Sequence, residues 1–143
     1  MTIVKATLIA LTALTAAGAA QAGPNLVPKF NVNSGVIGVA NVGTDPAGRS
    51  IVTIGCAASG GGICPEPPAA LLAPYQIAGY PNVAAVRANP IDAGKVFSHK
   101  ISFYNSLVFV PGTYYFTVCA DAGNHVAETN EGDNCKRFTK IVK

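Results

Sequence analysis

The sequence of 143 residues contains no tryptophan, a single methionine and only two histidines. Charged residues make up 12% of the chain, and the formal net charge is +3. A charge this small, spread along the chain, argues against a protein that binds nucleic acid or an anionic membrane surface. With two histidines and no Gly-x-Ser-x-Gly motif, the sequence also lacks the usual signs of nucleophilic catalysis. We therefore expect a protein that is not an enzyme.

Residues 1–22 have the features of a secretory signal peptide. Lys5 supplies a positive charge, Ala6–Ala17 is a small and apolar run, and Ala20-Gln21-Ala22 is an A-x-A cleavage site. A run this short cannot span a bilayer as a stable anchor, although it could form a buried N-terminal helix instead. Cleavage would remove Lys5 and leave nine basic and seven acidic residues, a formal charge of +2. We expect residues 23–143 to form one domain, without a transmembrane segment, in the periplasm or outside the cell.

The four cysteines favour two disulfides, because the thiols of an exported chain leave the reducing cytosol. Proximity in the sequence favours the pairs Cys56–Cys64 and Cys119–Cys135. A bridge between Cys56 and Cys119 across two sheets, as in antibody domains, is the alternative, although no tryptophan is present to pack on it. A zinc site is disfavoured because no Cys-x2-Cys spacing occurs.

From residue 23 onward, short β-rich runs alternate with turn clusters, and no stretch has the period of an amphipathic helix. Pro28 places the first run at the edge of a sheet, and residues 35–42, apolar on both faces, suit a central strand. Six prolines between residues 65 and 94 exclude a long helix, and residues 65–80 are predicted to form a surface loop with one turn of helix. The runs predicted as strands are 26–32, 35–42, 50–56, 82–87, 95–104, 112–118 and 136–142.

Two side chains have specific predicted roles in this pattern. Alternation places His99 on the apolar face of its run, where a hydrogen-bonded residue at the edge of the core is more common than a metal ligand or a base. Tyr114 is a candidate tyrosine corner, with its hydroxyl reaching back to the backbone near the start of a strand.

The stretch from Cys119 to Cys135 has the pattern of a hairpin connection with a long polar tip. With the run before it, this stretch resembles the closing hairpin of CARDB domains, the immunoglobulin-like modules of bacterial surface and secreted proteins. The resemblance implies an all-β fold, an immunoglobulin-like antiparallel β-sandwich of about seven strands, and a role related to cell adhesion. The residues that carry it are Gly112, Tyr114, Asp121, Val126, Glu128, Asn130, Glu131 and Asn134.

Tyr75 and Tyr80 are the candidate residues for binding a partner. They lie in the proline-rich segment among apolar neighbours, an unusual composition for an irregular loop. Packing of this set over an open end of the sandwich is the alternative, because large exposed apolar patches are rare. The apolar neighbours are Leu71, Leu72, Ile77 and Val83.

The polar tip offers a candidate metal site, formed by Asp121, Glu128, Glu131 and Asp133. Carboxylate oxygens, with the amide oxygens of nearby asparagines, are ligands that calcium accepts. The spacing does not match an EF-hand loop. The alternative is that these side chains bond to local backbone amides and hold a long loop in place, so that no cofactor is needed.

From these features we expect an exported, noncatalytic binding or adhesion-like module. It would recognise a protein or glycan partner through its end loops or an edge strand. A calcium-stabilised structural module is the second hypothesis. A small secreted hydrolase is the third, since a site can be assembled from residues far apart in the sequence.

Overall fold

The computed structural model describes residues 22–143, and the predicted signal peptide, residues 1–22, lies outside this range except for its last residue. The described chain forms seven β-strands and one turn of α-helix, α1 (Ala69–Leu72). The strands are β1 (Leu26–Asn31), β2 (Val36–Asn41), β3 (Ser50–Ser59), β4 (Ala84–Ala88), β5 (Val96–Lys100), β6 (Gly112–Cys119) and β7 (Cys135–Val142). Among residues 22–143, no helix is long and apolar enough to cross a membrane.

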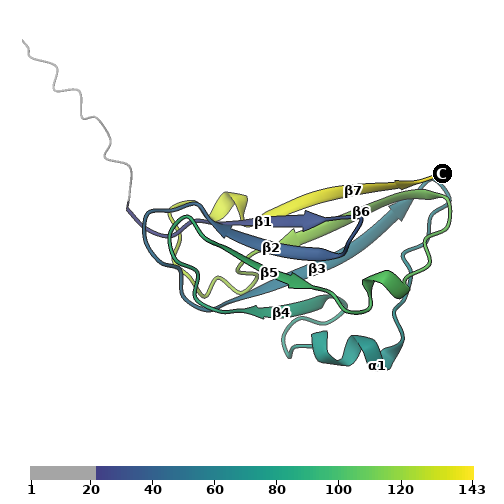
Figure 1. Ribbon diagram of the computed structural model, residues 1–143, viewed down its shortest axis with the longest axis horizontal. Coiled ribbons are helices and arrows are strands. Elements are labelled where there is room, and N and C mark those ends of the chain that lie inside the picture. Colours follow the sequence, from purple (N-terminus) through teal and green to yellow (C-terminus); the bar gives the residue numbers. More distant parts are fainter. Residues whose placement is uncertain (1–21) are drawn as a thin grey trace, which may run out of the picture.

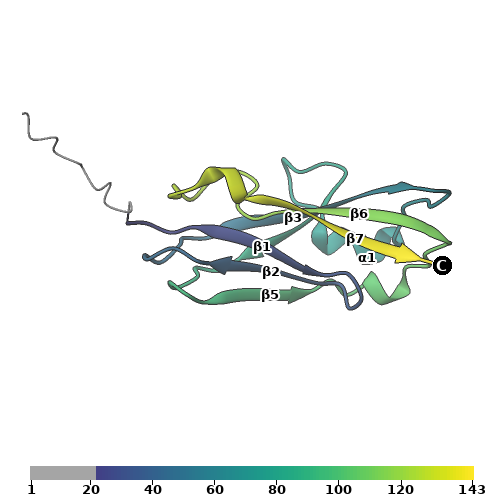
Figure 2. The ribbon, with the colours of Figure 1, turned by 90° about the horizontal axis from the view of Figure 1, so that it is seen from above.

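The strands form two antiparallel sheets, which face each other as the two layers of a sandwich (Figure 1). One sheet has the order β1-β2-β5 and the other has the order β4-β3-β6-β7. Figure 2 shows the layers from above, with β1 and β7 close to each other in different sheets, where they are in contact. The predicted all-β sandwich of seven strands is confirmed, as are the edge position of β1 and the central position of β2.

Every strand differs from the prediction by at least one residue, and three boundaries, the end of β3, the start of β4 and the end of β5, differ by two residues or more. Strand β3 continues to Ser59 because β6 pairs with it as far as the pair Ser59 and Thr113. Strand β4 begins at Ala84, after Asn82, which has a left-handed φ of 64°. Strand β5 ends at Lys100 because the chain then turns inward into a short 3-10 helix, η2 (Tyr104–Ser106).

The turn between β1 and β2 shows how this inward bend fits the rest of the fold. Gly35 has φ of 70°, and its amide donates to Asn31 O at 2.9 Å. Its own carbonyl accepts from Ile101 N at 3.0 Å. A Cβ at this position would collide with the ring of Tyr104. Glycine is therefore required here both by the backbone conformation and by the close approach of Tyr104.

The core lies between the sheets and contains Tyr114, which is 0% exposed. Its hydroxyl donates a hydrogen bond of 2.6 Å to Val110 O, four residues earlier, so the predicted tyrosine corner is confirmed. A buried phenol needs such a partner, because an unpaired hydroxyl in the core would cost free energy. Around it the rings of Phe30, Phe116 and Phe109 pack edge-on or tilted.

Both favoured disulfides are present, Cys56–Cys64 and Cys119–Cys135. The alternative bridge between Cys56 and Cys119 is wrong. Cys119 and Cys135 face each other as a pair of β6 and β7, so this bridge joins the last two strands at their base. The bridge Cys56–Cys64 instead links the interior of β3 to the segment that follows it.

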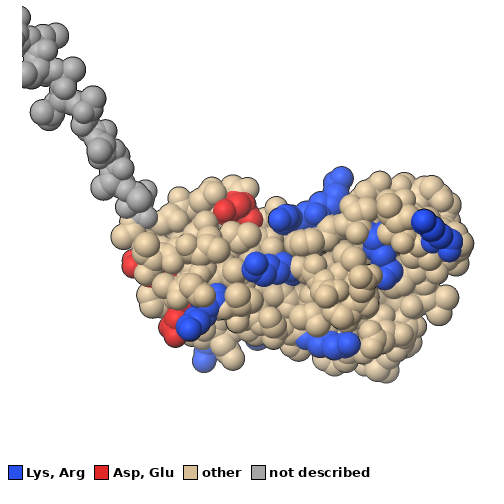
Figure 3. All heavy atoms as spheres, turned by 45° about the horizontal axis from the view of Figure 1, so that its top comes forward, with Lys and Arg blue, Asp and Glu red and all other residues tan. Residues whose placement is uncertain are grey.

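Charged side chains are unevenly distributed over the surface (Figure 3). In this view, acidic residues lie toward the end where the described chain begins, whereas lysine and arginine are spread over the whole face. Four of the seven acidic residues belong to the connection between β6 and β7, Asp121, Glu128, Glu131 and Asp133.

Candidate functional site

The long segment between β3 and β4, residues 60–83, is called the insert here. It contains α1 and the 3-10 turn η1 (Ala73–Tyr75), and it lies on the side of the sandwich where β4 and β5 are the edge strands. Contacts between η1 and β4 hold it to one sheet. The interactions of Tyr75 hold it to the other, so the insert closes this side of the sandwich.

Tyr75 is the main point at which the insert is attached to the segment after β5. Its hydroxyl accepts a hydrogen bond of 2.8 Å from Ser102 N and donates one of 3.1 Å to Ser102 Oγ. Its ring packs edge-on against Phe103 at 5.1 Å and against His99 at 5.8 Å. His99 Nε2 lies 3.5 Å from the Tyr75 hydroxyl, so this histidine has the predicted place at the edge of the core.

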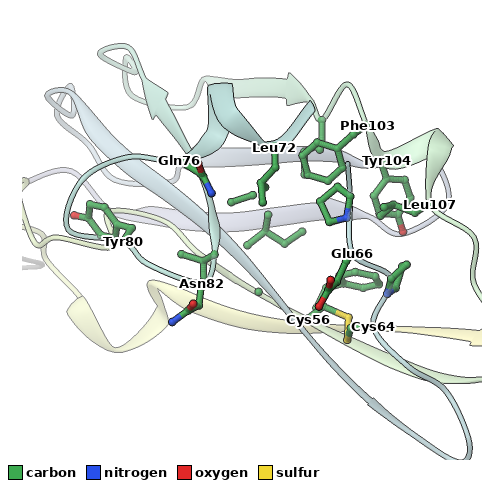
Figure 4. Close-up of a pocket in the computed structure, with 18 of the residues that line it drawn as sticks. Cys56, Cys64, Glu66, Leu72, Gln76, Tyr80, Asn82, Phe103, Tyr104 and Leu107 are labelled. Atoms are coloured by element: carbon green, nitrogen blue, oxygen red, sulfur yellow. A yellow bond between two sulfur atoms is a disulfide. The ribbon is translucent and has the colours of Figure 1, made fainter. Parts of the chain in front are cut away.

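Beneath the insert lies a cavity of about 850 Å³, the apolar pocket. Its walls come from the insert, from the start of β4, from β3 and β6, and from the segment after β5. Figure 4 shows Phe103, Tyr104 and Leu107 at one end and Tyr80 and Asn82 at the other. The volume is within the usual range for a ligand site.

Few polar groups line the apolar pocket. The residues of the lining with polar side-chain groups are Glu66, Gln76, Asn82, Tyr80 and Tyr104. Burial raises the pKa of Tyr104 to about 12, and its hydroxyl donates to Val32 O at 2.5 Å. The lining contains no histidine, serine or lysine, and its two cysteines are joined in the Cys56–Cys64 bridge. Such a lining can hold and orient an apolar group, but it offers no nucleophile with a base.

The two predicted partner-binding tyrosines have different positions. Tyr75 is 6% exposed and holds the insert in place. Tyr80 is half-buried and lines the apolar pocket. The apolar neighbours noted in the sequence also differ in position. Leu72, Ile77 and Val83 line the apolar pocket, whereas Leu71 is 40% exposed. The role of Tyr75 and Tyr80 in partner binding stays a prediction.

The four carboxylates predicted as calcium ligands accept hydrogen bonds from nearby N–H groups. Asp121 Oδ2 accepts from Val126 N at 2.7 Å, and Glu131 accepts from Glu128 N at 2.9 Å. Glu128 itself accepts from Leu26 N, and Asp133 accepts from Asn25 Nδ2 at 3.2 Å. These bonds hold the β6–β7 connection together and attach it to the start of β1.

Within the described part of the chain, no three His, Cys, Asp or Glu side chains are grouped so that they could hold a metal ion. Five buried side-chain oxygens in this region nevertheless have no hydrogen-bond partner, and they belong to Asn25, Asp121, Glu128, Asp133 and Asn134. Burial raises the pKa of Glu128, and the negative charges of Glu131 and Asp121 raise it further, although the Leu26 amide opposes them. Water or a proton on Glu128 would satisfy some of these oxygens.

Comparison with known proteins gives one finding. Residues 74–138 match the CARDB family. The match includes the whole stretch from Gly112 to Asn134 that carried the resemblance, which is thereby confirmed. It begins inside the insert, at Pro74, and does not include β1, β2 or β3. No curated protein and no solved structure matches the chain.

Proposed function

Because residues 74–138 match the CARDB family of immunoglobulin-like, adhesion-related modules, we propose that this protein is an exported, noncatalytic binding module. Its binding site is the apolar pocket beneath the insert, and its ligand is an apolar group of a partner molecule. The observation that carries the proposal is a cavity of about 850 Å³ with mainly apolar walls that a loop, rather than a sheet, covers.

Two further features support this assignment. Binding residues are commonly placed on loops that a rigid scaffold positions, and the insert is such a loop on a β-sandwich. The two disulfides fit an oxidising compartment, such as the periplasm or the extracellular space. The apolar walls favour a protein partner, which can insert an aliphatic or aromatic side chain, over a glycan.

The direct test is to fill the pocket from the insert. Ala78 is exposed but lines the pocket, so Ala78→Trp would place a large side chain at its mouth without removing core atoms. Ala93→Trp, at an exposed alanine in the turn before β5, is the matched control. Nile red, a neutral apolar dye, is the probe, and its fluorescence reports binding.

We expect wild-type protein and the Ala93→Trp variant to bind Nile red equally. Ala78→Trp should weaken binding by roughly tenfold, which corresponds to about 1.4 kcal/mol. The same three proteins, used as bait on cell-envelope extract of the source organism, should capture a common partner that only Ala78→Trp fails to retain. Equal binding of the dye by all three proteins would refute the pocket as the site. A captured glycan in place of a protein would correct the partner class.

A further inference from the structure

A second hollow of about 530 Å³ lies where β3 begins and β4 ends, and it is called the basic hollow here. Arg49, Arg87, Asn89 and His125 line it, and no acidic residue does. It shares no lining residue with the apolar pocket.

Strand register explains why the two arginines lie on the same side. Ser50 pairs with Ala88, and both are buried on the core side of the sheet. Because side chains alternate along a strand, the residues on either side of this pair point away from the core. Arg49, Arg87 and Asn89 are therefore on the outer face of the sheet, and all three are exposed.

His125 reaches this face because the connection after β6 folds back over β3. Ala122 N donates to Ile51 O at 2.8 Å, and Asn124 N donates to Asp121 O at 2.9 Å. Asp121 and Asn124 have left-handed φ values of 34° and 48°, a conformation that Asp and Asn adopt more readily than most residues. The carboxylate of Asp121, the acidic residue of this turn, accepts from Val126 N.

The absence of a side chain at Gly123 allows the imidazole of His125 to approach the backbone closely. A Cβ at this residue would collide with His125 Nε2 and also with the Tyr80 hydroxyl. Because Tyr80 lines the apolar pocket and His125 lines the basic hollow, the two sites approach each other at Gly123.

We propose that the basic hollow binds an oxyanion, such as a carboxylate or phosphate group. A guanidinium group stays protonated at all relevant pH values, and its planar array of donors matches the oxygens of either anion. Asn89 and His125 add further N–H donors, and no acidic side chain of the lining competes for the guanidinium groups. This proposal does not depend on the function proposed for the apolar pocket, although the two sites lie close together.

The test is an NMR titration of the whole domain, residues 23–143, at constant ionic strength. Inorganic phosphate and citrate are the two probes, so that a phosphate ligand is distinguished from a carboxylate ligand. Chloride keeps the ionic strength equal. The double variant Arg49→Gln/Arg87→Gln removes both guanidinium groups. Lys29→Gln/Lys143→Gln, at two exposed lysines elsewhere, changes the net charge equally and is the control.

In wild-type protein, we expect shifts of the backbone amides around Arg87 and His125 with at least one probe. The double arginine variant should weaken binding by about tenfold, and the lysine control by less than about twofold. Arg49→Lys, which keeps the charge but loses the fork of donors, should also bind more weakly than wild type. The proposal is overturned if neither anion shifts these amides, or if the arginine and lysine double variants lose affinity equally. Because all the substituted side chains are exposed, unchanged melting temperatures should confirm that each variant is folded.

Discussion

At the scale of single residues, Tyr75 and Tyr80 show how two similar side chains in one loop acquire different roles. Tyr75 is buried, and its hydroxyl bonds to the backbone and the side chain of Ser102. Tyr80 is half-buried, and its hydroxyl lies against Gly123. The sequence could not separate them, because the distinction depends on segments that follow much later in the chain.

We predict that Tyr75→Ala lowers the free energy of unfolding by about 3–5 kcal/mol, as expected for a buried aromatic side chain. Tyr80→Ala should cost less than half as much, because its side chain is only partly buried. Urea denaturation measures both values. Nile red binding should fall in Tyr80→Ala while the fold is retained. Equal destabilisation by the two changes would show that Tyr80 also serves mainly to hold the fold together.

Glu128 is the carboxyl group whose pKa is raised, mainly because of its burial. Since its pKa in the folded state lies above the unfolded value, the folded state binds more protons between these two pKa values. Stability therefore falls as pH rises through this window, and the ionised group weakens the fold at neutral pH.

Glu128→Gln should accordingly raise the melting temperature at pH 7 and leave it nearly unchanged at pH 4, where the wild-type carboxyl is largely protonated. Thermal melts in EDTA at the two pH values provide the measurement. The same melts with added calcium test the hypothesis of a calcium-stabilised module. If calcium raised the melting temperature of wild type by several degrees but not that of Glu128→Gln, the result would support a calcium-stabilised module over the noncatalytic binding module that we propose.

At the scale of elements, the two disulfides constrain different parts of the fold. Cys119–Cys135 closes the connection between β6 and β7 and does not line the apolar pocket. Cys56 and Cys64 do line it, and their bridge restrains a loop with three successive glycines, Gly60–Gly62.

Replacing Cys119 and Cys135 by alanine should lower the free energy of unfolding by about 3 kcal/mol, since a loop of about 15 residues is released. Replacing Cys56 and Cys64 should cost about 2 kcal/mol, because the loop is shorter. Only the second pair of changes should weaken Nile red binding, because it loosens a wall of the pocket. The proposed site would be contradicted if replacing Cys119 and Cys135 weakened dye binding while replacing Cys56 and Cys64 left it unchanged.

The elements themselves were largely predictable, because alternation and turn residues are local signals. Pro28 indicated an edge strand, and the proximity of the cysteines indicated both bridges. The ends of β3 and β5 were not predictable, because β6 extends the first and the burial of Phe103 and Tyr104 ends the second. The apolar pocket was only suggested by the apolar residues of the insert. The basic hollow was missed, because it combines two strands with a turn far along the sequence.

At the scale of the whole molecule, the family match and the folding unit do not coincide. The match covers residues 74–138, yet β3 lies between β4 and β6, and β2 lies between β1 and β5. Without the first three strands, β4 and β5 have no partner, and β6 keeps only residues 135–138 of β7 as its partner. A single two-stranded hairpin is at best marginally stable in water.

We predict that residues 74–138 produced alone are unfolded, whereas residues 23–143 fold with both disulfides. Dispersion of amide signals in NMR spectra and circular dichroism provide the comparison. A cooperative thermal transition of the shorter chain would show that the first three strands are dispensable.

The fold has an odd number of strands, and each strand runs in the opposite direction to the one before it in the chain. The two ends of the fold therefore lie at opposite ends of its long axis (Figure 1). The first strand bonds to β2 and the last to β6, with each ladder lying along this axis. A mechanical pull between Gly23 and Lys143 would therefore load many of these hydrogen bonds at once, in shear, instead of opening them one after another. Tension along the chain would meet resistance first at β1 and β7.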